Sequence, residues 1–103
     1  MITSNTIQEY LNRMNVPHSL KGYLMLADGI ELAIKNRRRF VMGNIYIDVA
    51  SQFDSTPSKV ERAMRHAIGK TDAPCTNREF LTRAADELLL RQSKENGIAC
   101  VST

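Results

Sequence analysis

Residues 45–70 read IYIDVASQFDSTPSKVERAMRHAIGK, and this stretch decides the fold. Its second half carries strong signals for the start of a helix. Thr56 is a good N-cap, and Pro57 can take the first helical position, where its missing N–H costs nothing. The apolar residues that follow recur with a helical period: Val60, Ala63, Met64, Ala67 and Ile68. The pattern therefore predicts a helix over 57–70 with one buried face.

The opposite face of the 57–70 helix is polar and mostly basic. At 100° per residue, one arc of this helix gathers Ser58, Lys59, Arg62, Arg65 and His66. Because a guanidinium presents a planar fork of donors, Arg62 and Arg65 can each bind guanine O6 and N7 through two hydrogen bonds. We expect these two arginines to read bases in DNA.

Other residues on or beside the arc also suit a DNA interface. His66 can donate to a base or a phosphate, and Glu61, at the edge of the arc, can accept from cytosine N4 or orient an arginine. Ser58 and Lys59, at the positive end of the helix dipole, suit phosphate. The alternative for Glu61 and Arg65 is a surface pair at i and i+4, which contributes about 0.2–0.5 kcal/mol, and the sequence leaves it open.

The first half of the stretch predicts another helix. The spacing of Val49, Ala50 and Phe53 favours a helix over 45–53, although the β-branched run at 40–47 also permits a short strand. A three-residue connection, 54–56, then leads into the 57–70 helix. Small Ala50 suits a close helix crossing, and Ser55 is expected to serve in the turn where many such motifs have glycine. Residues 45–70 thus have the order and length of a helix-turn-helix, whose second helix enters the major groove.

Three more helices complete the expected architecture. Apolar spacing predicts a short helix over 7–14, interrupted at Asn15, and a longer one over 19–34. Gly22 and Gly29 share a face of the longer helix, so they either permit close approach of another helix or only weaken this one. Thr76 to Glu79 form a capping box for a last helix with a broad apolar face. We expect residues 1–103 to form one all-α domain of five to six helices that contains the helix-turn-helix.

Positive charge is concentrated in one part of the chain. Residues 35–70 hold eight basic and three acidic side chains, whereas the whole chain has a net charge of +3. This asymmetry indicates an electropositive surface suited to a polyanion. Within it, Arg37, Arg38 and Arg39 either favour the negative end of the preceding helix dipole or contact phosphate. The sequence alone does not separate these two roles.

Several classes of protein do not fit the sequence. It contains neither a long apolar run nor a signal peptide. We therefore expect a cytoplasmic, nucleoid-associated protein that does not bind a membrane. Cys75 and Cys100 lack metal-ligand spacing and are expected to be reduced thiols with no metal site. No nucleophile motif or phosphate loop appears, and we read the acidic pair Asp86–Glu87 as solvated surface. We therefore expect no catalytic residues, no cofactor and no enzyme activity.

Three segments are similar to one known family: VPHSLKGYLMLADGIELAI (16–34), IYIDVASQFDSTPSKVERAMRHAI (45–68) and TNREFLTRAADELL (76–89). They resemble the C-terminal DNA-binding effector domain of stage-zero sporulation protein A, the response regulator of sporulation in endospore-forming bacteria. The resemblance is densest in SKVERAMRHAI (58–68). It implies an all-α fold of the six-helix type, binding to double-stranded DNA boxes of the form TGTCGAA, and tandem head-to-tail occupancy of them. By position, it assigns base recognition to Glu61, Arg62, Arg65 and His66.

The chain also departs from that family pattern. Family members carry a phosphoacceptor receiver domain, which a chain of this length has no room for. The segment between the 57–70 helix and the capping box, 69–75, is much shorter than in the family, where it is associated with RNA polymerase contacts. That contact is therefore not carried over to this chain. Arg37, Arg38 and Arg39 have no clear counterpart in the family pattern.

Together these features predict a sequence-specific DNA-binding protein that regulates transcription, and the resemblance implies genes of the sporulation type. Homodimeric association on the DNA is a further expectation. The alternative is a protein-interaction module that keeps the fold and antagonises a full-length sporulation regulator without binding DNA. Retention of the basic arc and of all four recognition positions favours DNA.

Overall fold

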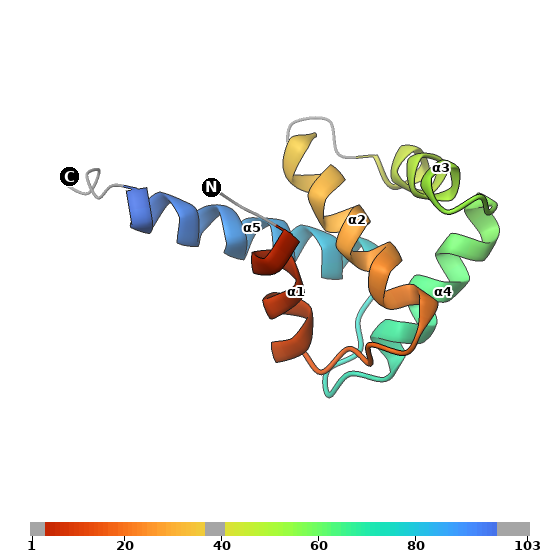
Figure 1. Ribbon diagram of the computed structural model, residues 1–103, viewed down its shortest axis with the longest axis horizontal. Coiled ribbons are helices and arrows are strands. Elements are labelled where there is room, and N and C mark those ends of the chain that lie inside the picture. The colour runs from red at the N-terminus through yellow and green to blue at the C-terminus, as the bar shows by residue number, and fades with distance from the viewer. Residues whose placement is uncertain (1–3, 37–40, 97–103) are drawn as a thin grey trace.

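The computed structural model describes residues 4–36 and 41–96, and these form five α-helices (Figure 1). The helices are α1 (Ser4–Arg13), α2 (Lys21–Lys35), α3 (Met42–Gln52), α4 (Pro57–Gly69) and α5 (Asn77–Asn96). The all-α expectation is confirmed. No helix within the described ranges is long and apolar enough to cross a membrane. The arginines at 37–39 lie outside the described residues.

The first helix ends at Arg13, two residues before the asparagine that the sequence predicts to interrupt it. Asn15 takes a left-handed conformation with φ 66°, which asparagine tolerates better than most residues. Val16 N–H then donates to the Leu11 carbonyl over 3.1 Å, and Asn15 N–H donates to that of Asn12 over 3.0 Å. These two bonds are a Schellman ending, which satisfies the last carbonyls of α1. The chain can therefore turn sharply into α2.

Helix α2 lies at the centre of the arrangement and contacts α4 very closely. A Cβ added at Gly22 would lie 2.3 Å from the Ala63 carbonyl oxygen of α4. A Cβ added at Gly29 would lie 3.0 Å from Met64 Cε and 3.3 Å from a methyl of Leu81 on α5. Both glycines therefore permit close helix approach, which decides between the two roles that the sequence left open.

Helix α3 begins three residues earlier than the sequence predicts. It starts at Met42 rather than at residue 45, and the strand allowed for 40–47 is wrong, since 42–47 are helical. Burial explains the outcome, because only a helical period places Ile45, Val49 and Ala50 together in the core. Packing thus outweighs the β-propensity of the branched residues.

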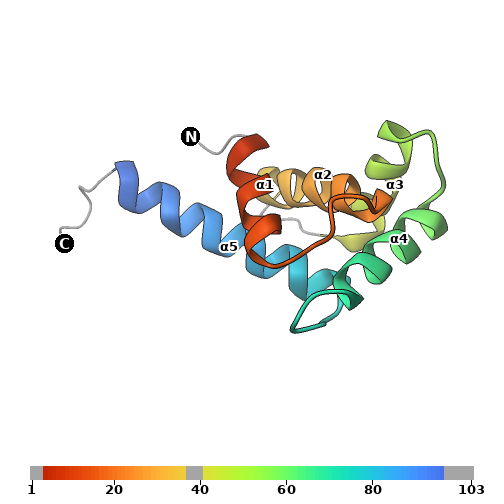
Figure 2. The same ribbon diagram turned by 60° about the horizontal axis from the view of Figure 1, so that its bottom comes forward.

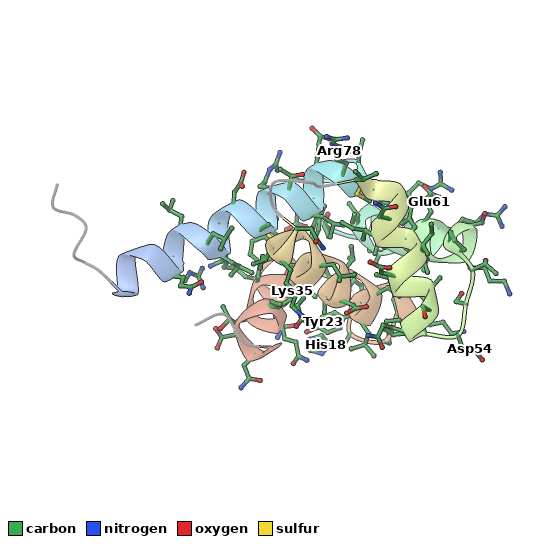
Figure 3. The ribbon with its side chains drawn as sticks, turned by 90° about the horizontal axis from the view of Figure 1, so that it is seen from above. His18, Tyr23, Lys35, Asp54, Glu61 and Arg78 are labelled. Carbon is green, nitrogen blue, oxygen red and sulfur yellow. The ribbon has the colours of Figure 1, made fainter. Side chains whose placement is uncertain are left out.

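The turn between α3 and α4 uses a different residue from the one expected. Asp54, not Ser55, takes the left-handed conformation, with φ 53°. Aspartate enters this region more readily than most residues, so no glycine is required. Ser55 N–H donates to the Ala50 carbonyl over 2.9 Å, which again closes the helix with a Schellman-type bond. Asp54 marks this turn at the end of the molecule in Figure 3.

Helix α5 is the longest and carries one side of the core. Its buried face consists of Phe80, Leu81, Ala84, Ala85 and Leu88. Figures 1 and 2 show its C-terminal half extending away from the other helices, at the end opposite α3 and α4. Glu87 lies at the surface, as the sequence predicts, and its carboxylate pairs there with Arg13 of α1 and with Arg91 over 3.3 Å.

Candidate nucleic-acid interface

The second helix of the helix-turn-helix starts where the sequence predicts. Thr56 Oγ1 accepts from Lys59 N–H over 3.2 Å, and Pro57 occupies the first helical position. Such a cap satisfies one of the backbone donors that a helix start leaves unpaired. The helix ends at Gly69, one residue short of the predicted range. Its orientation is thus set by a fixed entry point directly after the Asp54 turn.

The apolar stripe of α4 faces the core. Val60, Met64, Ala67 and Ile68 are fully buried, and Ala63 is half-buried against the backbone of α2. Because this stripe is locked in place, the opposite arc must face solvent. The five side chains of that arc are all exposed: Ser58, Lys59, Arg62, Arg65 and His66. The structure thus brings these five predicted residues together on one accessible face.

Glu61 stands at the margin of this face, as the sequence predicts. Its side chain is 34% exposed, against 66% for Arg65, and the two form an ion pair over 3.4 Å. The surface pair that the sequence left open is therefore present. An exposed pair of this kind contributes only a few tenths of a kcal/mol, so a nucleic acid could compete for Arg65 at small cost. The pair also holds Arg65 along the exposed face of α4.

Asn77 joins the candidate site from α5, and the sequence interpretation missed it. Asn77 is only 6% exposed. Its Nδ2 donates to Tyr46 Oη of α3 over 3.0 Å and to the backbone carbonyl of Glu61 over 3.1 Å. One signal could have revealed it: Asn77 precedes Phe80 and Leu81 by three and four positions, so a polar residue stands in register with the apolar face.

An open pocket of about 640 Å³ lies where α3, α4 and the start of α5 meet. Its lining includes Tyr46, Asn77 and four charged side chains. Those four are Glu61, Arg65, Arg78 and Glu79. Figure 3 shows Glu61 and Arg78 on the same side of the molecule. Since two arginines face two glutamates, the lining carries no net charge and is a poor anion site. We therefore centre the interface on the arc of α4 and not on this pocket.

The remaining sequence candidates contribute little to the described surface. Arg37, Arg38 and Arg39 lie outside the described residues, and Lys35, at the end of α2, is exposed and pairs with Glu31 over 3.6 Å. Cys75 is a free, half-buried thiol, and burial raises its pKa, so it is a weak nucleophile. Within residues 4–36 and 41–96, no group of three or more potential ligand side chains could hold a metal ion.

Comparison with known protein families gives a match over this architecture. The family described as sporulation initiation factor Spo0A C terminal matches residues 7–96. The match covers nearly the whole chain, from the first buried residue of α1 to the end of α5. It includes both helices of the helix-turn-helix, the turn between them and the capping box of α5.

Proposed function

The chain belongs to the Spo0A C-terminal family of DNA-binding effector domains, and from this premise we propose that it reads a short DNA box by placing α4 in the major groove. DNA binding and regulation of transcription are the general activity of that family. The box that we propose has the form TGTCGAA. The genes it controls would then be of the sporulation type.

The observation that carries this proposal is the two-sided character of α4. One side is fixed in the core by four fully buried apolar residues, and the other presents exposed cations in a single arc. A rigid helix with an exposed arc is what base readout requires, because the donors must be held in register with the base edges. The Thr56 cap and the Asp54 turn fix the N-terminal half, which enters the groove in this motif.

Each residue of the arc has a proposed role. Arg62 and Arg65 bind guanine through their guanidinium forks, and Glu61 accepts from cytosine N4 while it orients Arg65. His66 donates to a base acceptor or to phosphate. These four form the base-contacting set. Contacts to phosphate are assigned to Ser58 and Lys59 at the start of α4, and, from their charge alone, to Arg37, Arg38 and Arg39.

The proposal also covers how copies of the chain occupy DNA. We propose that two copies bind adjacent boxes in tandem or as a homodimer, because a single helix contacts few base pairs and a second copy adds affinity without new chemistry. The connection between α4 and α5 is short, from Lys70 to Thr76. We therefore assign no RNA polymerase contact to it.

The test is fluorescence anisotropy of the purified chain with a duplex carrying TGTCGAA, beside a scrambled duplex, over a series of salt concentrations. We expect at least tenfold tighter binding to the box, and a preference that persists as salt rises, since base contacts are less salt-sensitive than phosphate contacts. Equal and salt-sensitive affinity for both duplexes would contradict base readout. No binding to either duplex would favour an antagonist that acts through protein contacts.

A further inference from the structure

Two polar residues are buried among the described residues, Thr71 and Asn77, and only the first is explained by local structure. Thr71 Oγ1 donates to the Ile68 carbonyl over 2.7 Å and so closes the end of α4. Asn77 instead reaches out of its own helix to α3 and to α4. A buried polar side chain that joins three elements calls for a reason beyond helix capping.

The Asn77 amide can take only one orientation at this junction. Its Nδ2 faces the Glu61 carbonyl oxygen, and turning the amide over would place Oδ1 against that carbonyl, oxygen against oxygen. Its Oδ1 is buried and has no hydrogen-bond partner among the described residues. All the hydrogen bonding of this side chain therefore comes from its donor group.

The contact falls at the part of α4 that carries the base-contacting set. The Glu61 carbonyl lies in the same helical turn as Arg62 and Arg65. On another side of α4, Gly22 of α2 abuts the Ala63 carbonyl and Ala67 Cβ, where no side chain could intervene. Gly22 and Asn77 therefore hold α4 from two directions. Two fixed points on different sides of a cylinder limit both its tilt and its rotation about its own axis.

We propose that Asn77 is a positioning residue for base readout, which sets the rotation of α4 and so the register of Arg62 and Arg65 against the base edges. Asn77 itself is not expected to touch DNA, since its side chain is almost wholly buried. Base contacts tolerate little displacement, whereas contacts to phosphate tolerate more because they depend on charge. Loss of the Asn77 hydrogen bonds to α3 and α4 should therefore reduce the preference for the box over other DNA sequences more than it reduces the affinity for DNA in general. This inference rests on the proposed function.

The first test replaces the amide donor with a carboxylate, with Asn77→Asp. The carboxylate has nearly the same shape but cannot donate to the Glu61 carbonyl, and it remains favourable for α5 itself because an anion suits a helix N-terminus. The matched control is Asn5→Asp, which adds the same charge at an exposed position of α1. Anisotropy with the TGTCGAA and scrambled duplexes gives the preference. We expect Asn77→Asp to lower it about tenfold, with scrambled-duplex affinity close to that of Asn5→Asp.

The second test removes the other partner, with Tyr46→Phe. It adds no charge and keeps the Asn77 bond to Glu61, but it removes the acceptor on α3, so we expect a smaller fall in preference, about threefold. This variant remains informative if Asn77→Asp does not fold, which circular dichroism would reveal. The slope of log affinity against log salt should stay as in the wild type for both variants, because every phosphate-binding residue is kept.

The outcomes distinguish a failure of the positioning role of Asn77 from a failure of the proposed DNA-binding function. If folded Asn77→Asp and Tyr46→Phe keep the wild-type preference and lose only thermal stability, Asn77 is merely structural and the inference is overturned. If the wild type itself shows no preference for the box, the proposed function fails and the inference fails with it. A wild-type preference that both variants reduce supports the inference.

Discussion

Arg62 and Lys59 lie three positions apart on the exposed arc of α4, but they differ in what they can recognise. A guanidinium forms two parallel hydrogen bonds with one guanine, whereas an ammonium acts as a compact point charge. Lys59 also lies in the first turn of the helix, where phosphate is favoured. Substitution of Arg62 should therefore change the preference for a DNA sequence, whereas substitution of Lys59 should change only the charge-dependent affinity for DNA.

We predict that Arg62→Ala strongly reduces the preference for the TGTCGAA box and leaves weaker, general binding at low salt. A bidentate contact to guanine supplies about 1–3 kcal/mol of discrimination, and truncation removes all of it. Lys59→Ala is the matched control and should weaken binding to both duplexes equally. Anisotropy on both duplexes measures the two effects, and an unchanged preference in Arg62→Ala would remove this residue from the base-contacting set.

Asp28 of α2 shows how one residue can work against stability. Its Oδ2 is buried and has no hydrogen-bond partner in the described part of the chain. Burial raises the pKa of Asp28 above its usual value, the carboxylates of Glu31 and Asp48 raise it further, and Lys35 lowers it. The folded state therefore holds the proton more tightly than the unfolded state. Stability from this group is present at low pH and is lost as the pH rises from about 3.8 through the folded pKa.

We predict that Asp28→Asn raises the free energy of unfolding at pH 7 by up to about 1 kcal/mol, since it removes a half-buried, unpaired charge whose cost is reduced by solvent screening. For a domain of this size, a gain of about 1 kcal/mol would raise the melting temperature by roughly 4–8 °C. Thermal unfolding at pH 7 and pH 4 checks the sign, because the gain should shrink as the wild-type carboxyl becomes protonated. Glu9→Gln, at an exposed position of α1, is the control. A gain that grows toward pH 4 would contradict this assignment.

For single residues, the sequence predicted the positions that follow from helical periodicity and missed the roles that depend on tertiary contacts. The exposed arc of α4 follows from the spacing of its apolar residues alone, so its five members were predicted correctly as one face. Asp54 and Asn77 were missed for a different reason. Their roles depend on a backbone angle and on partners in α3 and α4, and neither appears in the pattern of one segment.

Among the elements, helix starts were predictable wherever a side chain marks them. Thr56 caps α4, and at α5 Thr76 Oγ1 accepts from Glu79 N–H over 3.1 Å while Glu79 accepts from Thr76 N–H over 3.2 Å. Helix α3 begins after Val41, whose side chain makes no capping hydrogen bond. Its start is set by packing, which explains why the sequence placed it three residues too late.

The close crossing of α2 and α4 at Gly22 should be sensitive to added side-chain volume. We predict that Gly22→Ala destabilises the fold by about 1–3 kcal/mol, because the new Cβ would lie 2.3 Å from the backbone oxygen of Ala63, which cannot rotate away as a side chain could. Gly43→Ala in α3 is the matched control. No atom would lie within 4 Å of its Cβ, so it should stabilise by up to about 1 kcal/mol through helix propensity.

Urea or thermal unfolding of the two variants measures both changes. Equal effects at positions 22 and 43 would mean that α2 and α4 do not cross as closely as described. Because Gly22 also limits where α4 can lie, a folded Gly22→Ala variant should lose preference for the box as well. That second readout distinguishes a shift of α4 from a simple loss of stability.

Over the whole molecule, the exposed cations of α4 lie at one end. The helix-turn-helix lies at one end, with the exposed cations of α4, and the long α5 extends toward the other (Figures 1 and 2). The fold class, the order of the helices and the basic arc all followed from sequence patterns. Sequence patterns did not predict three other features: the contacts at Gly22, the hydrogen bonds of Asn77 and the pocket beside α4. Each of these brings together segments that are distant in the chain.

The basic segment at 37–39 gives a prediction at this scale. Replacing Arg37, Arg38 and Arg39 together with glutamine should flatten the slope of log affinity against log salt by up to about 0.9 for each phosphate group that the variant no longer binds. The preference for the box should stay the same, since these residues are not assigned to bases. An unaltered slope would return the three arginines to a role at the negative end of the α2 dipole.

The central claim is that α4 reads the major-groove edge of guanine, and a single change in the DNA tests it most directly. Replacing the box guanines with 7-deazaguanine removes the N7 acceptor from the major groove and keeps base pairing. We predict that the wild type binds this duplex about tenfold more weakly than the normal box, whereas the double variant Arg62→Ala, Arg65→Ala binds the two alike. Wild-type affinity that is the same for both duplexes, alongside a persistent preference over scrambled DNA, would contradict readout by α4.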